Sequence, residues 1–211
     1  MSNRAVLQVP TKQLTLRRLR RAELPESSIN MARYLVGKTL VRELSRGRLV
    51  GRIVETEAYL PGDAACHAYG GITPRNRALF MDRGHSYVYF IYGNHFMLNV
   101  VGGREGIGTG VLLRAIEPLE GIELMKKHRG VTRLHELTSG PGKLAQAFRI
   151  NMRLYGQDYC AEGPLWLADA VQPVGRIGKS PRIGINKNAA PLLRFYEKGN
   201  PFVSGPKALN G

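Results

Sequence analysis

Two β-rich apolar runs joined by a Gly-Asn pair constrain the fold of this chain more than any other feature. The runs are SYVYFIY at 86–92 and HFMLNVV at 95–101, with Gly93 and Asn94 between them. Because glycine and asparagine tolerate a positive φ, this connection is typical of a tight β-hairpin. The turn also interrupts the longest apolar stretch well short of the ~20 apolar residues that a membrane helix needs. We therefore predict a soluble protein with an antiparallel sheet.

Hydrophobic periodicity adds helices and further strands around this hairpin. The pattern predicts helices over 26–36, 118–129 and 142–150, and strands over 38–44, 48–59, 110–116, 165–168, 181–185 and 193–196, with a terminal hairpin through Gly199 and Asn200. The glycine-rich stretch 61–76 is typical of a long loop. With no internal repeat and no linker, the expected fold class is α+β: one domain with a curved, mostly antiparallel β-sheet, a protruding β-hairpin and surrounding α-helices.

Positive charge is concentrated at the two ends of the chain. The net charge is +15; residues 1–22 carry six basic residues and no acid, and residues 176–211 carry seven against one. This distribution favours a polyanionic partner such as nucleic acid, with binding that weakens as salt rises. A merely solubilising surface is the alternative, and the N-terminal segment also suits a targeting peptide. We expect 1–22 to be a basic tail, 23–205 the folded domain and 206–211 a C-terminal tail.

Three side chains at a spacing of two share one face of the predicted strand over 48–59: Glu55, Glu57 and Tyr59. Two carboxylates on one face belong either to a solvated surface or to a functional site. Cys66 and His67 follow within ten residues of Glu57, which favours the site. Arg75 and Arg77 come next along the chain and are candidates to hold a phosphate.

The hairpin and the strand after it carry three further candidates. Tyr92 immediately precedes the turn and should project from the tip, where an aromatic side chain can insert between base pairs. Asn99 is a polar exception in an apolar run and either satisfies a neighbouring strand or contacts a base edge. Arg114 has only apolar neighbours, so it either pairs with an anion such as Glu57 or extends to water.

The sequence lacks the motifs that are typical of several enzyme classes. The chain has no HExxH, CxxC, Walker or GxSxG motif, and its five histidines show no metal-ligand spacing. Two cysteines in 211 residues do not form a disulfide framework. We expect neither a metal nor a cofactor.

Taken in order, the motifs resemble those of the alkyladenine (3-methyladenine, or methylpurine) DNA glycosylases over about residues 25–205. The resemblance is carried by VETEAY at 54–59, His67, TPRNR at 73–77, YVYFIYG at 87–93, Asn99, LLRAIEP at 112–118, LTSGPGKL at 137–144, PRIGI at 181–185 and RFY at 194–196. Two departures stand out: Cys66 occupies a position where a small residue is commoner, and the hairpin tip reads Gly93-Asn94-His95.

The resemblance implies a base-excision-repair enzyme that flips an alkylated or deaminated purine out of duplex DNA and hydrolyses its N-glycosidic bond with an activated water. By similarity, Glu57 is the general base, and Arg114 with the backbone of Ile183 holds the water. The flipped base is enclosed by Tyr59, His67 and Tyr89, and it contacts Asn99, which disfavours guanine. The residues expected against the DNA duplex are Tyr92, which fills the vacated place, and the backbone contacts Arg75, Arg77 and Arg182.

The same resemblance sets the expected partner and products. The partner is double-stranded DNA containing 3-methyladenine, 7-methylguanine, hypoxanthine or ethenoadenine, with no membrane involved and the protein acting as a monomer. Because the motifs place no lysine at the site, we expect an abasic product without strand cleavage. The protein would work in the bacterial cytoplasm (nucleoid) or the eukaryotic nucleus and would not be secreted. A non-catalytic nucleic-acid-binding module and, more weakly, an RNA-modifying hydrolase are the alternatives.

Overall fold

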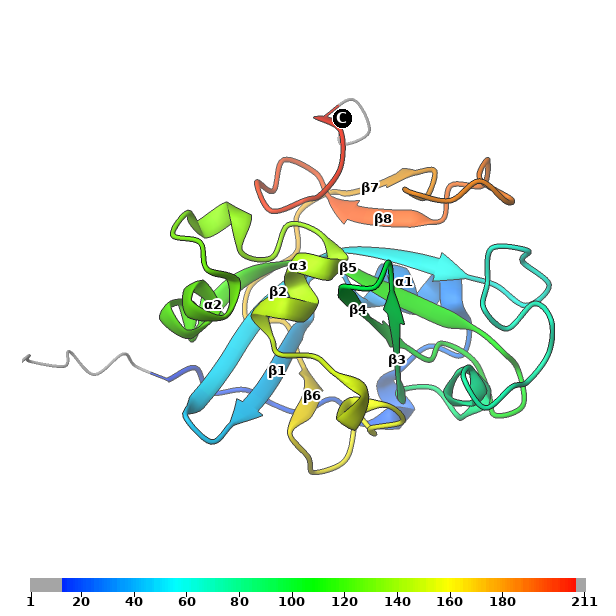
Figure 1. The fold of residues 1–211 in the computed structure, drawn as a ribbon, viewed down its shortest axis with the longest axis horizontal. Helices are drawn as coiled ribbons and strands as arrows, with labels where there is room; N and C mark the ends of the chain where they lie inside the picture. The colour runs from blue at the N-terminus through cyan, green and yellow to red at the C-terminus, as the bar shows by residue number, and fades with distance from the viewer. Residues whose placement is uncertain (1–12, 208–211) are drawn as a thin grey trace, which may run out of the picture.

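A curled antiparallel sheet of eight strands organises the computed structural model, which describes residues 13–207 (Figure 1). The strand order is β3-β4-β5-β2-β1-β6, with β8 paired to β2 and β7 to β8. The strands are β1 Thr39–Leu44, β2 Gly47–Tyr59, β3 Ser86–Ile91, β4 His95–Val100, β5 Gly110–Glu120, β6 Leu165–Ala168, β7 Ile177–Ser180 and β8 Arg194–Glu197. The α-helices are α1 Ser28–Leu35, α2 Ile122–Arg129 and α3 Pro141–Ala147, and the 3-10 helices are Arg21–Glu23, Arg77–Phe80, Leu134–Glu136 and Met152–Leu154.

The long strand β2 is buried on both faces, and this burial places its acidic residues inside the protein. One edge pairs with β5 along almost its whole length, whereas the other pairs first with β1 and then, at 55–57, with β8. The β2–β5 register shifts twice around Glu55. Such irregularities bend a strand and change where its side chains point. In Figure 1 the β7–β8 hairpin lies across the end of the sheet and covers this part of β2.

The main hydrophobic core lies between the sheet and its helices. Helix α1 begins after Ser27, whose side chain accepts a hydrogen bond from the Asn30 backbone, and its Met31 and Leu35 are fully buried. Helices α2 and α3 lie side by side, joined by a 2.8 Å hydrogen bond between His128 Nδ1 and the Ala147 carbonyl. The α+β fold class predicted from the sequence is confirmed.

Two local predictions are wrong. The helix expected from 118 begins only at 122, because residues 118–120 continue β5 and Gly121 adopts a left-handed conformation with φ 74° that separates strand from helix. The strand expected at 181–185 lies instead at 177–180, because Pro181 cannot donate a hydrogen bond to a ladder and the residues after it turn toward β2. That turn brings a backbone amide to the site described below.

The expected terminal hairpin through Gly199 and Asn200 is also absent from the described residues. Strand β8 pairs backward with β7, and residues 201–207 contain no strand. The Asn200 side chain stabilises the turn itself by accepting a 2.9 Å hydrogen bond from the Phe202 amide.

The basic N-terminal segment is attached to the body over the part that the structure describes, residues 13–22. Leu19 is fully buried, and its amide donates to the Leu167 carbonyl at 2.9 Å. Arg17 pairs with Glu23 and Asp169. Leu19 and Arg17 thus contact the rest of the protein, and the limits of the domain stay a prediction. Residues 1–12 of the expected tail, and 208–211 at the other end, lie outside the described range. Between residues 13 and 207, no helix combines the length and apolar character required to cross a membrane.

Candidate active site

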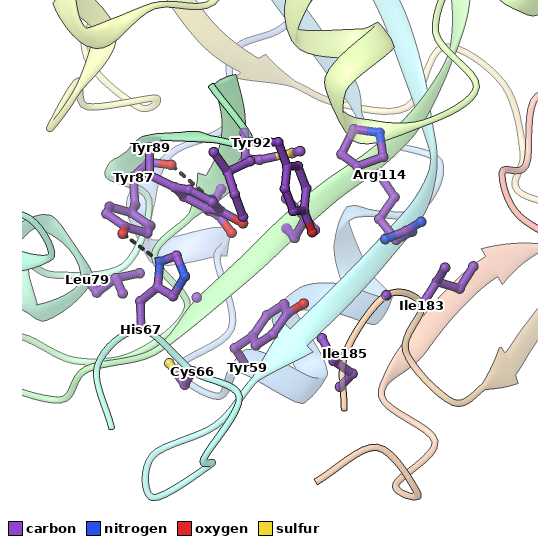
Figure 2. Close-up of a pocket in the computed structure, with 17 residues that line it drawn as sticks. Tyr59, Cys66, His67, Leu79, Tyr87, Tyr89, Tyr92, Arg114, Ile183 and Ile185 are labelled. Atoms are coloured by element: carbon purple, nitrogen blue, oxygen red, sulfur yellow. Dashed lines mark hydrogen bonds between the residues drawn. The ribbon is translucent and has the colours of Figure 1, made fainter. Parts of the chain in front are cut away.

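A cavity of about 290 Å³ opens where the β3–β4 hairpin, the 61–76 loop and the segment after β7 meet over β2 and β5 (Figure 2). Its lining combines aromatic side chains with a few polar groups. The predicted site residues that line it are Tyr59, His67, Tyr89, Tyr92, Asn99, Arg114 and Ile183. Concave sites of this composition bind small flat ligands, the class to which a single nucleobase belongs.

Aromatic rings form one wall of the cavity. The rings of His67 and Tyr89 have centroids 4.5 Å apart, and Tyr87 stacks on Tyr89 at 5.3 Å. His67 Nδ1 lies 2.8 Å from the Tyr87 hydroxyl oxygen, and this hydrogen bond fixes the imidazole. Figure 2 shows Tyr59 turned toward the same space from β2. The arrangement provides a slot with π-faces on which a planar base can stack.

Glu57 has an exposed fraction of 0% and contacts three residues that line the cavity. Its Oε1 accepts a 2.7 Å hydrogen bond from the Ile183 amide and lies 3.2 Å from Arg114 Nη1, and its Oε2 accepts a 3.1 Å hydrogen bond from the Tyr59 hydroxyl. Burial raises the pKa of Glu57 above the usual glutamate range, although these three partners act in the opposite direction. A carboxylate with a raised pKa beside a cavity is suited to accept a proton.

The second acid of the motif is buried as well. Glu55 has an exposed fraction of 0%, so the alternative of a solvated strand face is excluded. Its Oε1 accepts hydrogen bonds from Arg114 Nε at 2.8 Å and from Arg194 Nε at 2.6 Å. Arg114 is therefore buried between the two carboxylates and does not extend to water. Although burial disfavours its charged form, Glu57 and Glu55 raise the pKa of Arg114.

The remaining pocket residues are neutral or apolar at neutral pH. Loss of hydration where the imidazole packs against the tyrosines, together with nearby Arg75, lowers the pKa of His67. Burial raises the pKa of the Cys66 thiol, which also lines the cavity. Burial likewise raises the pKa of Tyr89, to about 12. Asn99 Nδ2 donates to the Tyr87 carbonyl at 3.1 Å, so this side chain both satisfies the neighbouring strand and faces the cavity.

The hairpin tip presents Tyr92 at the mouth of the cavity. Its exposed fraction is 75%, and its backbone adopts the left-handed region with φ 55°. The next residue, Gly93, also has a positive φ. The turn therefore consists of residues 92–94, with Ile91 paired to His95, and includes Tyr92 in addition to the expected Gly93 and Asn94. His95 folds back from the tip onto α3: a Cβ at Gly142 would lie 3.1 Å from His95 Cγ.

Comparison with known proteins decides what kind of enzyme carries this site. A family model described as methylpurine-DNA glycosylase matches residues 22–201. The chain belongs to the methylpurine-DNA glycosylase family. This result confirms the resemblance inferred from the motifs and identifies a DNA-3-methyladenine glycosylase, an enzyme that repairs alkylated purines in DNA, in place of a non-catalytic binding module.

Individual relatives agree with the family assignment. A Mesorhizobium japonicum protein is 59% identical over 189 residues, which cover 90% of this chain and 91% of the relative. A Paraburkholderia phytofirmans protein is 43% identical over 197 residues, 93% of this chain and 92% of the relative. A Methanocella arvoryzae protein is 48% identical over 182 residues, 84% of this chain and 90% of the relative. All three bear the name "Putative 3-methyladenine DNA glycosylase".

The three arginines that we expected to contact the DNA backbone differ in their exposure to solvent in this methylpurine-DNA glycosylase. Arg75 and Arg77 are exposed beside the hairpin. Arg182, in contrast, is 4% exposed: it pairs with Asp63 and donates to the Ala58 and Asn188 carbonyls, each at 3.0 Å. Its guanidinium also lies 4.6 Å from the centre of the Tyr59 ring. The expected phosphate contact at Arg182 therefore has little exposed guanidinium to support it, and the contacts of this side chain lie within the protein.

Arg114 and the Ile183 amide both contact Glu57 directly, so Arg114 pairs with the acid that the sequence offered as its partner. Their expected contact with a water stays a prediction. The sequence placed Glu55 on the same strand face as Glu57 but did not identify Arg194 as its partner, because spacing along a strand does not reveal which distant cation pairs with an acid. Within residues 13–207, no group of three or more His, Cys, Asp or Glu side chains is arranged to bind a metal ion.

Proposed function

We propose that this glycosylase flips a damaged purine into the aromatic slot and hydrolyses its N-glycosidic bond with a water activated by Glu57. The observation that carries the proposal is the Glu57 carboxylate, which is buried next to the cavity and held by two groups of its lining, Arg114 and the Ile183 amide. In the reaction the water oxygen bonds to the sugar carbon, the base departs with the electrons of the broken bond, and Glu57 takes the water proton. The product is an abasic site.

The aromatic slot accounts for selection of alkylated bases. A base inside duplex DNA is inaccessible, so the enzyme has to extrude it at a cost of a few kcal/mol, which is smallest for damaged pairs. Stacking on Tyr89, His67 and Tyr59 returns about 1–3 kcal/mol per base. A methylated purine that carries positive charge gains further from electron-rich rings. This chemistry fits 3-methyladenine and 7-methylguanine, and the neutral lesions hypoxanthine and ethenoadenine fit the same flat slot.

In this proposal the exposed residues beside the pocket contact the DNA duplex. Tyr92 takes the place of the extruded base, and Arg75 and Arg77 contact phosphates. Asn99 disfavours guanine because its amide, fixed by the Tyr87 carbonyl, meets the exocyclic amino group. Among the described residues no lysine lines the cavity, which supports water as the nucleophile rather than an amine. The enzyme works as a monomer in the compartment that holds the DNA.

A single-turnover assay tests the proposal. Duplex oligonucleotides carrying one hypoxanthine or one ethenoadenine are incubated with wild type and with Glu57→Gln, and half of each sample is treated with hot alkali. We expect wild type to give strand breaks only after alkali, since the product is an abasic site. Glu57→Gln should lose about 10²- to 10⁴-fold in rate, the range that a general base contributes. Equal rates for the two proteins would contradict the assignment of Glu57, and wild-type breaks without alkali would contradict hydrolysis by water alone.

A further inference from the structure

A second buried carboxylate lies next to the proposed general base and takes no part in the mechanism above. Glu55 and its partner Arg194 both have an exposed fraction of 0%. Glu55 comes from β2 and Arg194 from β8, at the point where these strands pair. Burial of a charged pair is costly unless its geometry and hydrogen bonding are complete, so the contacts of this pair indicate what it stabilises.

Glu55 and its surroundings fix the orientation of Arg114. Arg114 Nε donates to Glu55 Oε1 at 2.8 Å, and Arg114 Nη2 donates to Ser204 Oγ at 3.2 Å. With these two nitrogens held, Nη1 is directed toward Glu57 Oε1 at 3.2 Å. The orientation of the guanidinium toward Glu57 therefore depends on Glu55.

Arg194 supplies the second positive charge. Its Nε donates to Glu55 Oε1 at 2.6 Å, while Nη1 donates to Ser180 Oγ and Nη2 to the Ser204 carbonyl, each at 2.9 Å. Glu55 Oε2 also accepts a 2.7 Å hydrogen bond from the Ser204 amide. The carboxylates of Glu55 and Glu57 thus face the two guanidiniums of Arg114 and Arg194. Because Arg194 balances the charge of Glu55, Arg114 can contact Glu57 as well.

We infer that Glu55 and Arg194 are positioning residues for base excision: Glu55 orients Arg114 toward Glu57, and Arg194 neutralises Glu55 so that Arg114 stays shared between the two acids. This inference rests on the proposed role of Glu57 as general base. It assigns a function to a buried ion pair that does not line the cavity.

The charges around Glu57 give the two residues opposite effects. Glu57 is faced by Arg114 from β5, by Glu55 and Tyr59 from β2, by Tyr89 from β3 and by the Ile183 amide. The negative charge of Glu55 raises the pKa of Glu57, and the positive charge of Arg114 lowers it. Neutralising Glu55 should therefore lower the Glu57 pKa. Removing Arg194 should raise it, because Glu55 would then draw Arg114 toward itself.

The test measures single-turnover excision of hypoxanthine as a function of pH. On the acidic side of the profile, the pH at which the rate falls to half its maximum reports the ionisation of the general base, Glu57. We call this pH the midpoint. We expect this midpoint to move down in Glu55→Gln and up in Arg194→Met, each by about one pH unit, the low end of the effect of a neighbouring charge. Arg194→Lys keeps the charge and should stay near the wild-type midpoint. The double variant Glu55→Gln/Arg194→Met should resemble Glu55→Gln, because Arg194 acts through Glu55.

A matched control separates positioning from general destabilisation. Glu197 lies on the same strand as Arg194 and forms a buried pair with Arg52 that does not touch Glu57. Glu197→Gln should lower the melting temperature without moving the midpoint. Equal shifts in Glu197→Gln, or shifts of the same sign in Glu55→Gln and Arg194→Met, would overturn the inference.

The outcomes also separate this inference from the function on which it rests. If Glu57→Gln excises as fast as wild type, the proposed function itself fails. If Glu57→Gln is inactive but the midpoints of the other variants do not move, only the positioning role fails. Where Arg194→Met does not fold by circular dichroism, the near-isosteric Glu55→Gln decides the question.

Discussion

Glu57 and His67 border the same cavity, and their surroundings shift their pKa values toward each other. Burial raises the pKa of Glu57, whereas loss of hydration and Arg75 lower that of His67. In the proposed mechanism Glu57 has to be ionised, so we expect activity to fall as the pH drops through a pKa above that of an ordinary glutamate. The lowered pKa of His67 favours the neutral imidazole, so we propose that this ring acts as a stacking surface and not as a cationic acid.

Substitution of His67 tests this division of roles. His67→Phe keeps a ring against Tyr89 and loses the hydrogen bond to the Tyr87 hydroxyl. We expect the single-turnover rate on hypoxanthine to fall by less than about tenfold, at the low end of the energy of base stacking, with the pH profile unchanged in shape. The measurement is the rate between pH 5 and 9. Loss of the alkaline limb in the variant would instead identify His67 as the proton donor.

Sequence reasoning identified the individual residues of the pocket better than their partners. The spacing of Glu57 and Tyr59 on one strand and the isolated position of Arg114 are local signals, and the structure brings all three together. The role of Arg182 was not visible, because its partner Asp63 is separated from it by 119 positions. A cation's position in the sequence does not show whether it faces solvent or a buried acid.

Among the secondary-structure elements, the β3–β4 hairpin was the easiest to predict and the β7–β8 hairpin the hardest. The first has six-residue strands and a glycine turn, and its strands run as expected from Ser86 to Ile91 and from His95 to Val100. The second has strands of four residues, one of them mostly polar, so it lacks a clear hydrophobic alternation. It is held in place by pairing with β2, which is a tertiary effect.

Tyr92, at the tip of the β3–β4 hairpin, is the proposed wedge residue, the side chain that takes the place of the extruded base, and its substitution gives a prediction. Tyr92→Ala removes a ring with an exposed fraction of 75%, so the stability should change by no more than about 0.5 kcal/mol. The excision rate on duplex substrates should fall about tenfold to a hundredfold, since the extruded base would no longer be replaced by a stacking group. Single-turnover rates on duplex and single-stranded hypoxanthine substrates check this.

Tyr92→Phe is the matched control because it keeps the ring and removes only the hydroxyl. It should retain nearly the wild-type rate on duplex DNA. An equal loss for Tyr92→Ala on single-stranded DNA, where no base pair is opened, would show that the ring serves the pocket rather than the duplex.

Across the whole molecule, the net charge of +15 is divided between structural and exposed cations. Arg17 is engaged with acids of the body, and Arg182 and Arg194 are buried, so these members of the two basic ends do not form a phosphate-binding surface. Arg75 and Arg77 lie instead in the central part of the chain, which carries little net charge. The net charge correctly predicted a polyanionic partner, but it did not show which basic residues are engaged with acids of the protein itself.

Substitution of one exposed arginine and one buried arginine tests whether exposed cations bind DNA and buried cations stabilise the fold. Arg77→Gln should weaken binding to duplex DNA and reduce the slope of log K against log salt by about 1, as expected for one phosphate contact, with the melting temperature unchanged. Arg182→Gln should leave that slope unchanged but destabilise the fold by about 3–5 kcal/mol, because it leaves Asp63 buried without its partner. Fluorescence anisotropy at several salt concentrations and chemical denaturation provide the two measurements. A reduced slope for a folded Arg182→Gln would restore Arg182 to the DNA surface.

The amide of Ile183 reaches Glu57 across 126 positions of sequence, and Arg194 and Ser204 complete the same cluster from still later in the chain. A ribosome makes these residues after the acids, the aromatic residues of the slot and the β3–β4 hairpin, so the nascent chain carries Glu57 before the groups that hold it from the C-terminal side have emerged. Translation therefore supplies the proposed general base before its support from the segment after β7. A prematurely terminated product that ends before β8 retains the wedge but lacks the counter-ion of Glu55, and is expected to be removed as a misfolded chain.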